Sequence, residues 1–336
     1  MQTYVVAFAI ALIISWFLTP YVKNMAVRIG AVDKPDPRRV HKGVMPRLGG
    51  LAIFAGFVAA VLMTLIVSRD LAVILFGASL IVLVGVLDDV YQLPAKVKLT
   101  GQVAAAAVLV VFDIRIEWLN NPMGGYFYLE YLSVPFTIFW VVSFTNVVNL
   151  MDGLDGLAAG VSAIASVTII LVALQQGFYT VAVLTAALAG AIIGFIRYNF
   201  NPATIFMGDT GSMFIGYILA AISILGAVKS ATTIALVVPA VALGLPIMDT
   251  AFAIVRRHLN GKPIFKPDKG HFHHRLLAMG LTQRQAVILM YLISAGLGLG
   301  AILLTEIDGV YAMLLVSAIV AGVCFCAKKI GILNDH

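Results

Sequence analysis

Eleven apolar runs divide this chain, and short polar stretches separate them. A helix needs roughly 17 to 25 predominantly apolar residues to cross a bilayer, and most of the runs provide that length. The runs predicted to form membrane helices cover residues 2–22, 49–67, 71–87, 100–112, 131–148, 157–174, 179–196, 211–228, 232–255, 286–304 and 308–327. The pattern therefore predicts an all-α polytopic membrane protein with about 11 transmembrane helices, folded as one integral-membrane domain over residues 1–336.

Composition and charge predict a membrane location and the orientation of the chain in the membrane. The chain is 61% hydrophobic and only 11% charged, with a mean hydropathy of +1.02, whereas about a quarter of a soluble domain is charged. With eleven spans, the 22 Lys and Arg residues divide 19 to 3 between the two sides, and basic loops stay in the cytoplasm. We therefore expect the N-terminus outside and the C-terminus in the cytoplasm.

Three smaller expectations follow from the same reading. The first run has no basic leader and no small-residue cleavage site after it, so it should remain as a helix. Gly124 and Gly125, between W-L-N-N-P-M and Y-F-Y-L, predict a small extracellular hairpin with interfacial aromatic residues. Basic loops beside anionic lipid account for the pI of about 9.3 without a nucleic-acid partner.

Residues 146–160, N-V-V-N-L-M-D-G-L-D-G-L-A-A-G, place two amides and two carboxylates three residues apart between long apolar runs. On a helix these side chains would form a slowly drifting stripe, but the glycines of the stretch loosen a helix. We predict a membrane helix that ends near Asn149, a tight acidic turn, and a new helix that begins near Leu157. A connecting turn capped by Asp is the alternative without a function.

Further polar clusters fall on the same predicted side. Asp88 and Asp89 are adjacent at the end of the third span, where two carboxylates repel each other and favour a cation, a shared proton or a basic partner. The stretch G-D-T-G-S opens the eighth span, and a helix N-terminus beside Asp209 suits phosphate and Mg²⁺. Solvated helix ends and an ordinary helix cap are the plain alternatives.

The cytoplasmic loops carry cations. The loop before the tenth span contains H-F-H-H-R among several lysines, and because no Cys or Glu lies at zinc-ligand spacing, phosphate or a phosphosugar is the favoured ligand. Lys42 and Arg47 lie close to the second span and could neutralise phosphate, or simply belong to a positive-inside loop. Asp249, inside the ninth span, should be paired or face a substrate. Carboxylates and cations facing each other at one membrane edge suit Mg²⁺-dependent phosphoryl transfer.

Four of these stretches together resemble a known family. D-D-V-Y-Q-L-P-A-K, N-V-V-N-L-M-D-G-L-D-G-L, F-M-G-D-T-G-S and H-F-H-H-R-L are similar, in the same order, to the signature regions of the polyprenyl-phosphate N-acetylhexosamine-1-phosphate transferases. P-R-L-G-G and H-F-H-H-R resemble the WecA/TagO branch, which starts O-antigen, enterobacterial common antigen or wall teichoic acid linkage units. The resemblance, over about residues 35–284, implies a multi-pass protein of the bacterial cytoplasmic membrane with its active site on the cytoplasmic side.

The resemblance also implies a reaction and a role for each residue. UDP-GlcNAc would donate GlcNAc-1-phosphate to undecaprenyl phosphate, giving undecaprenyl-diphospho-GlcNAc and UMP, with Mg²⁺, or alternatively Mn²⁺, as cofactor. The implied catalytic pair is Asp88 and Asp89, and the implied metal ligands are Asp209 and Asp152. The implied substrate-binding residues are Lys42, Arg47, Asn146, Asn149, Asp155, His271, His273, His274 and Arg275.

Other functions compete with this one. An ion-coupled secondary transporter would also carry acidic residues within eleven spans, but transporter sites usually lie near the midplane at broken helices. A CDP-alcohol phosphotransferase would need a D-G-x-x-A-R spacing that is absent here. Within the resembled family, a donor other than UDP-GlcNAc stays open, as do the polymer that is primed and a homodimeric state.

Overall fold

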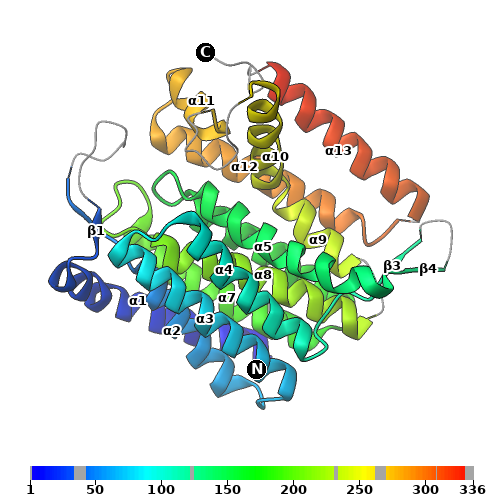
Figure 1. Ribbon diagram of the computed structural model, residues 1–336, viewed down its shortest axis with the longest axis horizontal. Helices are drawn as coiled ribbons and strands as arrows, with labels where there is room; N and C mark the ends of the chain where they lie inside the picture. The colour runs from blue at the N-terminus through cyan, green and yellow to red at the C-terminus, as the bar shows by residue number, and fades with distance from the viewer. Residues whose placement is uncertain are drawn as a thin grey trace.

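The computed structural model describes residues 2–33, 43–121, 125–230, 234–261, 270–307 and 309–329, which form a bundle of long helices (Figure 1). The helices are α1 (Thr3–Ile29), α2 (Gly49–Thr64), α3 (Arg69–Tyr91), α4 (Ala95–Val111), α5 (Ser133–Met151), α6 (Leu157–Gln175), α7 (Tyr179–Asn199), α8 (Gly208–Ser230), α9 (Ile234–Ala242), α10 (Gly244–Leu259), α11 (Phe272–Ala278), α12 (Gln283–Leu303) and α13 (Gly309–Lys329). Strand β1 (Val32–Asp33) pairs antiparallel with β2 (Met45–Pro46), and β3 (Trp118–Asn120) with β4 (Tyr126–Tyr128). A single turn of 3-10 helix, η1 (Glu130–Leu132), precedes α5.

The helices fall where the apolar runs predict them. Seven of those described are long and apolar enough to cross a bilayer: α1, α3, α5 with η1, α6, α7, α8 and α12. Helices α2 and α13 are shorter apolar helices, and α4 begins five residues before the predicted run. The chain is therefore an all-α polytopic membrane protein, while a total of eleven crossings stays a prediction.

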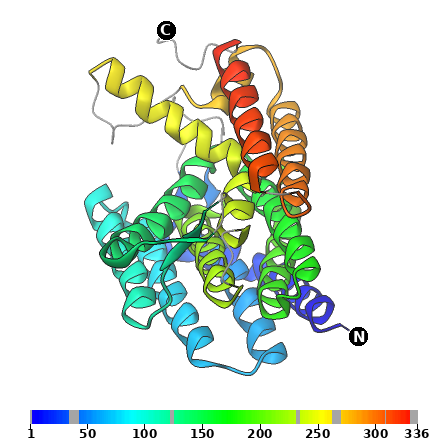
Figure 2. The ribbon, with the colours of Figure 1, turned by 90° about the vertical axis from the view of Figure 1, so that its right-hand side faces the viewer.

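The ninth run is broken into two helices. Helices α9 and α10 meet at an angle of 74°, and Figure 2 shows α10 projecting from the bundle. Pro246 lies in the first turn of α10, where a proline is tolerated because the first N–H groups of a helix have no partner within it. In one continuous helix Pro246 would stand in the interior, where its missing N–H would leave the carbonyl of the preceding turn without a hydrogen bond. A break between α9 and α10 is therefore favoured.

Helix α8 is the centre of the bundle. The apolar window of α8 is 94% buried, and the helix contacts α2, α3, α5, α7 and α9. Phe214 takes part in edge-on ring contacts with Phe54 and Phe57 of α2, at centroid distances of 5.4 and 5.5 Å. Because protein surrounds α8 on all these sides, its N-terminus is held in a fixed position.

The connections bring the polar motifs to one end of the bundle. Helices α3, α5 and α7 end there, and α4, α6 and α8 begin there, because each pair is joined by a short turn or loop. The predicted helix end, acidic turn and new helix are confirmed, since α5 ends at Met151 and α6 begins at Leu157. The predicted aromatic hairpin is confirmed as β3 and β4, with Trp118 opposite Tyr128.

Candidate active site

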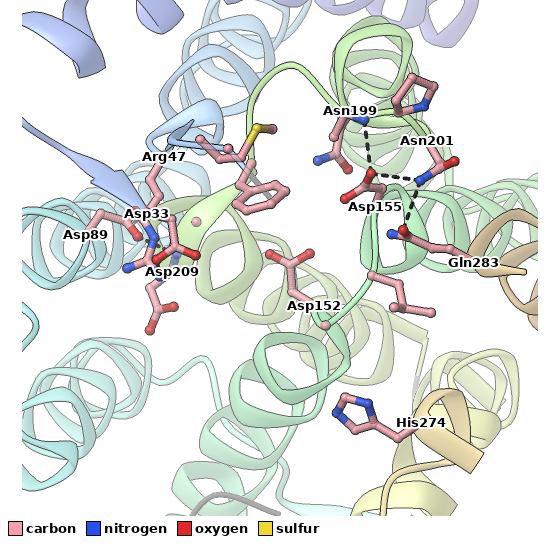
Figure 3. A pocket seen from close by; sticks show the side chains of 18 residues that line it. Asp33, Arg47, Asp89, Asp152, Asp155, Asn199, Asn201, Asp209, His274 and Gln283 are labelled. Atoms are coloured by element: carbon pink, nitrogen blue, oxygen red, sulfur yellow. Dashed lines mark hydrogen bonds and ion pairs between the residues drawn. The ribbon is translucent and has the colours of Figure 1, made fainter. Parts of the chain in front are cut away.

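A cavity of about 510 Å³ opens at this end of the bundle (Figure 3). Its walls come from the first loop, the ends of α3, α5 and α7, the starts of α8 and α12, and α11. The lining includes five aspartates, one arginine and one histidine: Asp33, Asp89, Asp152, Asp155, Asp209, Arg47 and His274. Figure 3 shows Asp152 between a group around Asp209 and a group around Asp155. Different contacts hold the side chains of the two groups in place.

Asp89 caps the N-terminus of α8 from a different helix. Its Oδ1 accepts the backbone N–H of Asp209 at 3.0 Å, and its Oδ2 accepts the N–H of Thr210 at 3.0 Å and the Thr210 hydroxyl at 2.6 Å. Both carboxylate oxygens are thus used, and the side chain is buried. A negative charge at a helix N-terminus is stabilised by the free N–H groups and the helix dipole.

Gly208 makes this contact possible. Its φ of +72° lies in the left-handed region, and a Cβ atom built on it would collide with the Asp89 carboxylate. Any other residue would therefore meet both a strained backbone and a clash. The glycine of G-D-T-G-S thus serves the approach of Asp89 to α8.

Lys98 joins the other member of the aspartate pair to α8. Its Nζ lies 2.7 Å from Asp209 Oδ2 and 3.3 Å from Asp88 Oδ2. Lys98 stands in the first turn of α4, and its side chain is 25% exposed. Asp88 and Asp209, from helices distant in sequence, therefore share one ammonium group. Lys98 was not among the residues predicted for the site, because nothing in the local sequence distinguishes it from Lys96 two residues before it.

The two predicted asparagines of α5 lie behind this wall. Asn149 donates to Ser212 Oγ at 2.9 Å, next to Asp209 on α8. Asn146 donates to Gln102 Oε1 at 2.6 Å and to the carbonyl of Val142 at 2.8 Å, one turn deeper. Neither amide belongs to the cavity lining. The structure thus places both where they tie α5 to α8 and α4.

The group around Asp155 is built from amides. Asp155 Oδ2 accepts the side-chain N–H of Asn201 and the backbone N–H of Ala203, each at 3.0 Å. Asn201 also donates to Gln283 Oε1 at 2.9 Å, which links the α7–α8 loop to α12 (Figure 3). Sequence reasoning did not select Asn201 or Gln283, although R-Y-N-F-N-P stands beside G-D-T-G-S in the chain.

Two residues outside the acidic turn hold it in place through Gly156. Asn199 Oδ1 accepts the N–H of Gly156 at 3.1 Å, and the Tyr291 hydroxyl donates to the carbonyl of Gly156 at 2.5 Å. Asn199 also donates to the carbonyl of Ile205 at 3.1 Å. The turn that carries Asp152 and Asp155 is therefore fixed to α7, α12 and the loop before α8.

Arg47 supplies the positive charge of the cavity wall. The Nη2 atom of Arg47 lies 2.7 Å from Asp33 Oδ1, and the backbone N–H of Arg47 donates to the carbonyl of Ala31 at 2.9 Å. The paired strands β1 and β2 therefore hold the two side chains together. Among the described residues that line the cavity, it is the one with a permanent positive charge. Lys42, the other predicted basic residue of this loop, lies outside the described residues.

The histidine cluster divides into different environments. Asp249 accepts the N–H of Phe272 at 2.8 Å and lies 3.0 Å from His271 Nδ1, which orients the start of α11. Asp249 is thus paired, one of the two expectations for it. His274 lines the cavity, whereas His271 and Arg275 do not belong to the lining.

His273 is buried behind the acidic turn. Its ring packs against Gly153 so closely that a Cβ atom there would meet Nε2, and neither ring nitrogen has a hydrogen-bond partner among the described residues. Burial, with a smaller contribution from His274, lowers the pKa of His273 to about 3. The imidazole is therefore neutral near pH 7 in this structure.

The pKa of Asp152 is shifted in the opposite direction to that of His273. Burial and the charges of Asp209 and Asp89 raise the pKa of Asp152 to about 7. Repulsion between carboxylates is relieved either by a proton or by a bound cation. The centre of the cavity thus favours positive charge.

Comparisons with known proteins identify relatives of this chain. Residues 71–227 match the family described as "Glycosyl transferase family 4". The chain is 43% identical to "Probable undecaprenyl-phosphate N-acetylglucosaminyl 1-phosphate transferase" of Bacillus subtilis (strain 168), covering 98% of this chain and 93% of that protein. It is 38% identical to "Decaprenyl-phosphate N-acetylglucosaminephosphotransferase" of Mycolicibacterium smegmatis (93% and 85%) and 30% identical to "Undecaprenyl-phosphate alpha-N-acetylglucosaminyl 1-phosphate transferase" of Escherichia coli K12 (82% and 77%).

The chain belongs to the polyprenyl-phosphate N-acetylhexosamine-1-phosphate transferase family. The magnesium ion that this family implies can be tested against the oxygen atoms present. No group of three His, Cys, Asp or Glu side chains suited to a metal occurs among the described residues. Mg²⁺, however, is usually held by one or two carboxylates together with water and substrate phosphates. In this family member, Asp88 and Asp209 already hold one cation, the Lys98 ammonium, so their oxygens fit a metal ion.

Proposed function

We propose that this protein transfers GlcNAc-1-phosphate from UDP-GlcNAc to undecaprenyl phosphate, releasing UMP and undecaprenyl-diphospho-GlcNAc. The observation that carries the proposal is the cavity itself, where carboxylates of α3, the acidic turn and α8 converge beside Arg47. The names of the relatives support the same donor sugar and lipid. The product would begin the membrane assembly of a cell-envelope glycan such as teichoic acid or lipopolysaccharide.

In this reaction a phosphate oxygen of the lipid attacks the sugar-bearing phosphorus, and the bond from that phosphorus to the UMP oxygen breaks. Two anions must meet, so the protein's first task is to reduce their repulsion and hold them in line. A phosphate monoester with its second pKa near 6 is already largely ionised at neutral pH. Proton removal is therefore a modest part of the task, and alignment the larger one.

The aspartate pair divides this work. Asp89 has both oxygens committed to α8, so we assign it the placement of Asp209. Asp88 does not belong to the cavity lining, but its carboxylate faces the Lys98 ammonium rather than the first turn of α8, and we assign it the contact with the lipid phosphate. This assignment favours a single in-line displacement over an aspartyl-phosphate intermediate. The member of the pair that lines the cavity is Asp89, and both of its oxygens already accept hydrogen bonds from α8.

We assign Mg²⁺, or Mn²⁺ in its place, to Asp209 and Asp88, the two carboxylates that meet at Lys98, with Asp152 nearby to add its charge. When bound, the ion would neutralise phosphate charge and polarise the phosphorus–oxygen bonds. Asp152 supports this choice because burial and the charges of Asp209 and Asp89 raise its pKa to about 7, and a cation in this part of the cavity would offset those charges. Asp209 would take the larger share, since its carboxylate already holds a cation at 2.7 Å.

The donor would lie across the rest of the cavity. Asp155, Asn201 and Gln283 present carboxylate and amide groups that suit hydrogen bonding to a nucleoside. Arg47 presents a guanidinium to a diphosphate, a geometry in which arginine binds two oxygens at once. His274 lines the opposite wall, and we assign it contact with the sugar phosphate.

The reaction sets the membrane orientation that we propose. Eleven crossings, with the N-terminus outside, place the cavity on the cytoplasmic side, where UDP-GlcNAc is available and where the basic loops lie. The lipid phosphate would reach the cavity from the inner leaflet.

The deciding experiment is UMP release by purified protein with Mg²⁺, undecaprenyl phosphate and a panel of UDP-sugars. We expect release with UDP-GlcNAc, dependence on the metal, and loss of both in Asp209→Asn. Preference for another UDP-amino sugar would replace the donor but keep the reaction. No UMP with any donor would reject the proposal.

A further inference from the structure

Lys98 occupies the space between the two carboxylates to which the proposed function assigns the divalent ion. Its ammonium nitrogen lies between a carboxylate oxygen of Asp88 and one of Asp209, at 3.3 and 2.7 Å. These are the two carboxylates with an oxygen turned to a cation, since both oxygens of Asp89 accept hydrogen bonds from α8. An ammonium and a metal ion cannot both occupy this space, because like charges at contact distance repel strongly.

The position of Lys98 allows it to leave. The residue stands in the first turn of α4, four residues after Pro94, and its side chain is 25% exposed, whereas the Asp88 side chain is 9% exposed. A lysine has a flexible four-carbon stem and a compact charge with rotatable donors. Movement of this one side chain would therefore free both carboxylates without any change in the helices.

We propose that Lys98 is a built-in competitor of the metal: its ammonium balances Asp88 and Asp209 in the metal-free protein and must be displaced when the divalent ion binds. This inference rests on the metal site of the proposed function and adds that the affinity for the ion is set partly by a residue that is not a ligand. Two cations that exclude each other from one site are linked, so removing one strengthens the binding of the other.

The test is direct titration of Mn²⁺ against the purified protein without substrates, with free Mn²⁺ followed by electron paramagnetic resonance. Lys98→Met should lower the dissociation constant by about tenfold, within the usual range of coupling between linked sites. Lys96→Met, which removes an exposed lysine from the same helical turn, should leave the constant unchanged. Asp209→Asn should abolish the tight site and so identify it.

A second measurement guards against a folding defect. With EDTA, Lys98→Met should unfold at a lower temperature than the wild type, because two carboxylates lose their counter-charge. Mn²⁺ should raise the unfolding midpoint of Lys98→Met by more than it raises the midpoint of the wild type. Lys98→Gln keeps a hydrogen-bond donor between the carboxylates and should show the same tighter binding if the Met variant does not fold.

Mn²⁺ binding that is unchanged or weaker in both Lys98 variants would overturn this inference alone, provided that the wild type releases UMP. A wild type that neither binds Mn²⁺ nor releases UMP would overturn the proposed function, and this inference with it.

Discussion

Asp88 and Asp89 show how two identical neighbours acquire different tasks. The carboxylate of Asp89 accepts three hydrogen bonds from the first turn of α8, whereas that of Asp88 faces the Lys98 ammonium. Replacing a carboxylate by an amide removes one acceptor oxygen and adds a donor. The same substitution should therefore have different consequences at the two positions.

For Asp89→Asn we expect a thermal midpoint lower by several degrees, because at least one buried N–H of α8 would face another donor, at a cost of about 1–3 kcal/mol. For Asp88→Asn we expect a smaller change in the midpoint and a loss of activity of about 100-fold, the lower end of what a general base contributes. Thermal unfolding in detergent and UMP release measure the two effects. Equal midpoints for the two variants would refute the division of roles.

Asp152 links stability to pH in the metal-free protein. Its pKa is raised to about 7, whereas an unfolded Asp titrates near pH 3.9. Between about pH 4 and 7 the folded chain thus binds more protons than the unfolded chain, so stability falls as the pH rises through this range. In EDTA, the thermal midpoint should fall between pH 5 and 8, and Asp152→Asn should flatten that fall. Parallel curves for the two proteins would contradict the assignment.

At the scale of elements, the acidic turn depends on a clamp made by other helices. Gly156 is held at its N–H by Asn199 of α7 and at its carbonyl by Tyr291 of α12. Asp155, one residue earlier, then meets Asn201 and Ala203. The position of Asp155, to which we assign contact with the nucleotide sugar, is thus set by hydrogen bonds with residues of α7, α12 and the α7–α8 loop.

Tyr291→Phe should loosen this clamp while preserving the ring that packs on Gly160. The loss of one hydrogen bond, about 1 kcal/mol, should raise KM for UDP-GlcNAc by roughly fivefold and change kcat little, because the chemistry lies on the other side of Asp152. Tyr311→Phe, at a side chain 64% exposed on α13, is the matched control. A fall in kcat with an unchanged KM would show that Tyr291 acts elsewhere.

Local patterns predict the elements but not their partners. The helix end near Asn149 and the start at Leu157 could be predicted because apolar runs and glycines mark them in the sequence itself. The bonds from Asp209 and Thr210 to Asp89 join residues 120 and 121 positions apart, and Lys98 meets Asp209 across 111. His273 shows the same limit, because a residue type that suggests a ligand lies buried behind Gly153.

For the whole molecule, the distribution of apolar surface and charge is the basis of the orientation that we propose. Helix α1 is largely uncovered, with 22% of its apolar window buried, whereas α8 is 94% buried, so lipid rather than protein surrounds the outer helices. Lipid contact alone does not distinguish the two sides of a membrane. The basic loops do, because Lys and Arg beside a span are retained in the cytoplasm.

This orientation predicts which positions a membrane-impermeant maleimide reaches in intact cells. With Cys324 and Cys326 replaced by Ser, a cysteine at Tyr128, 71% exposed on the β3–β4 hairpin, should be labelled from outside. A cysteine at Leu259, 73% exposed at the end of α10, should be labelled only after the membrane is opened, because it lies on the side of the cavity and the basic loops. Labelling of Leu259→Cys in intact cells would place the cavity outside, where UDP-GlcNAc is not supplied, and the proposed reaction could not proceed there.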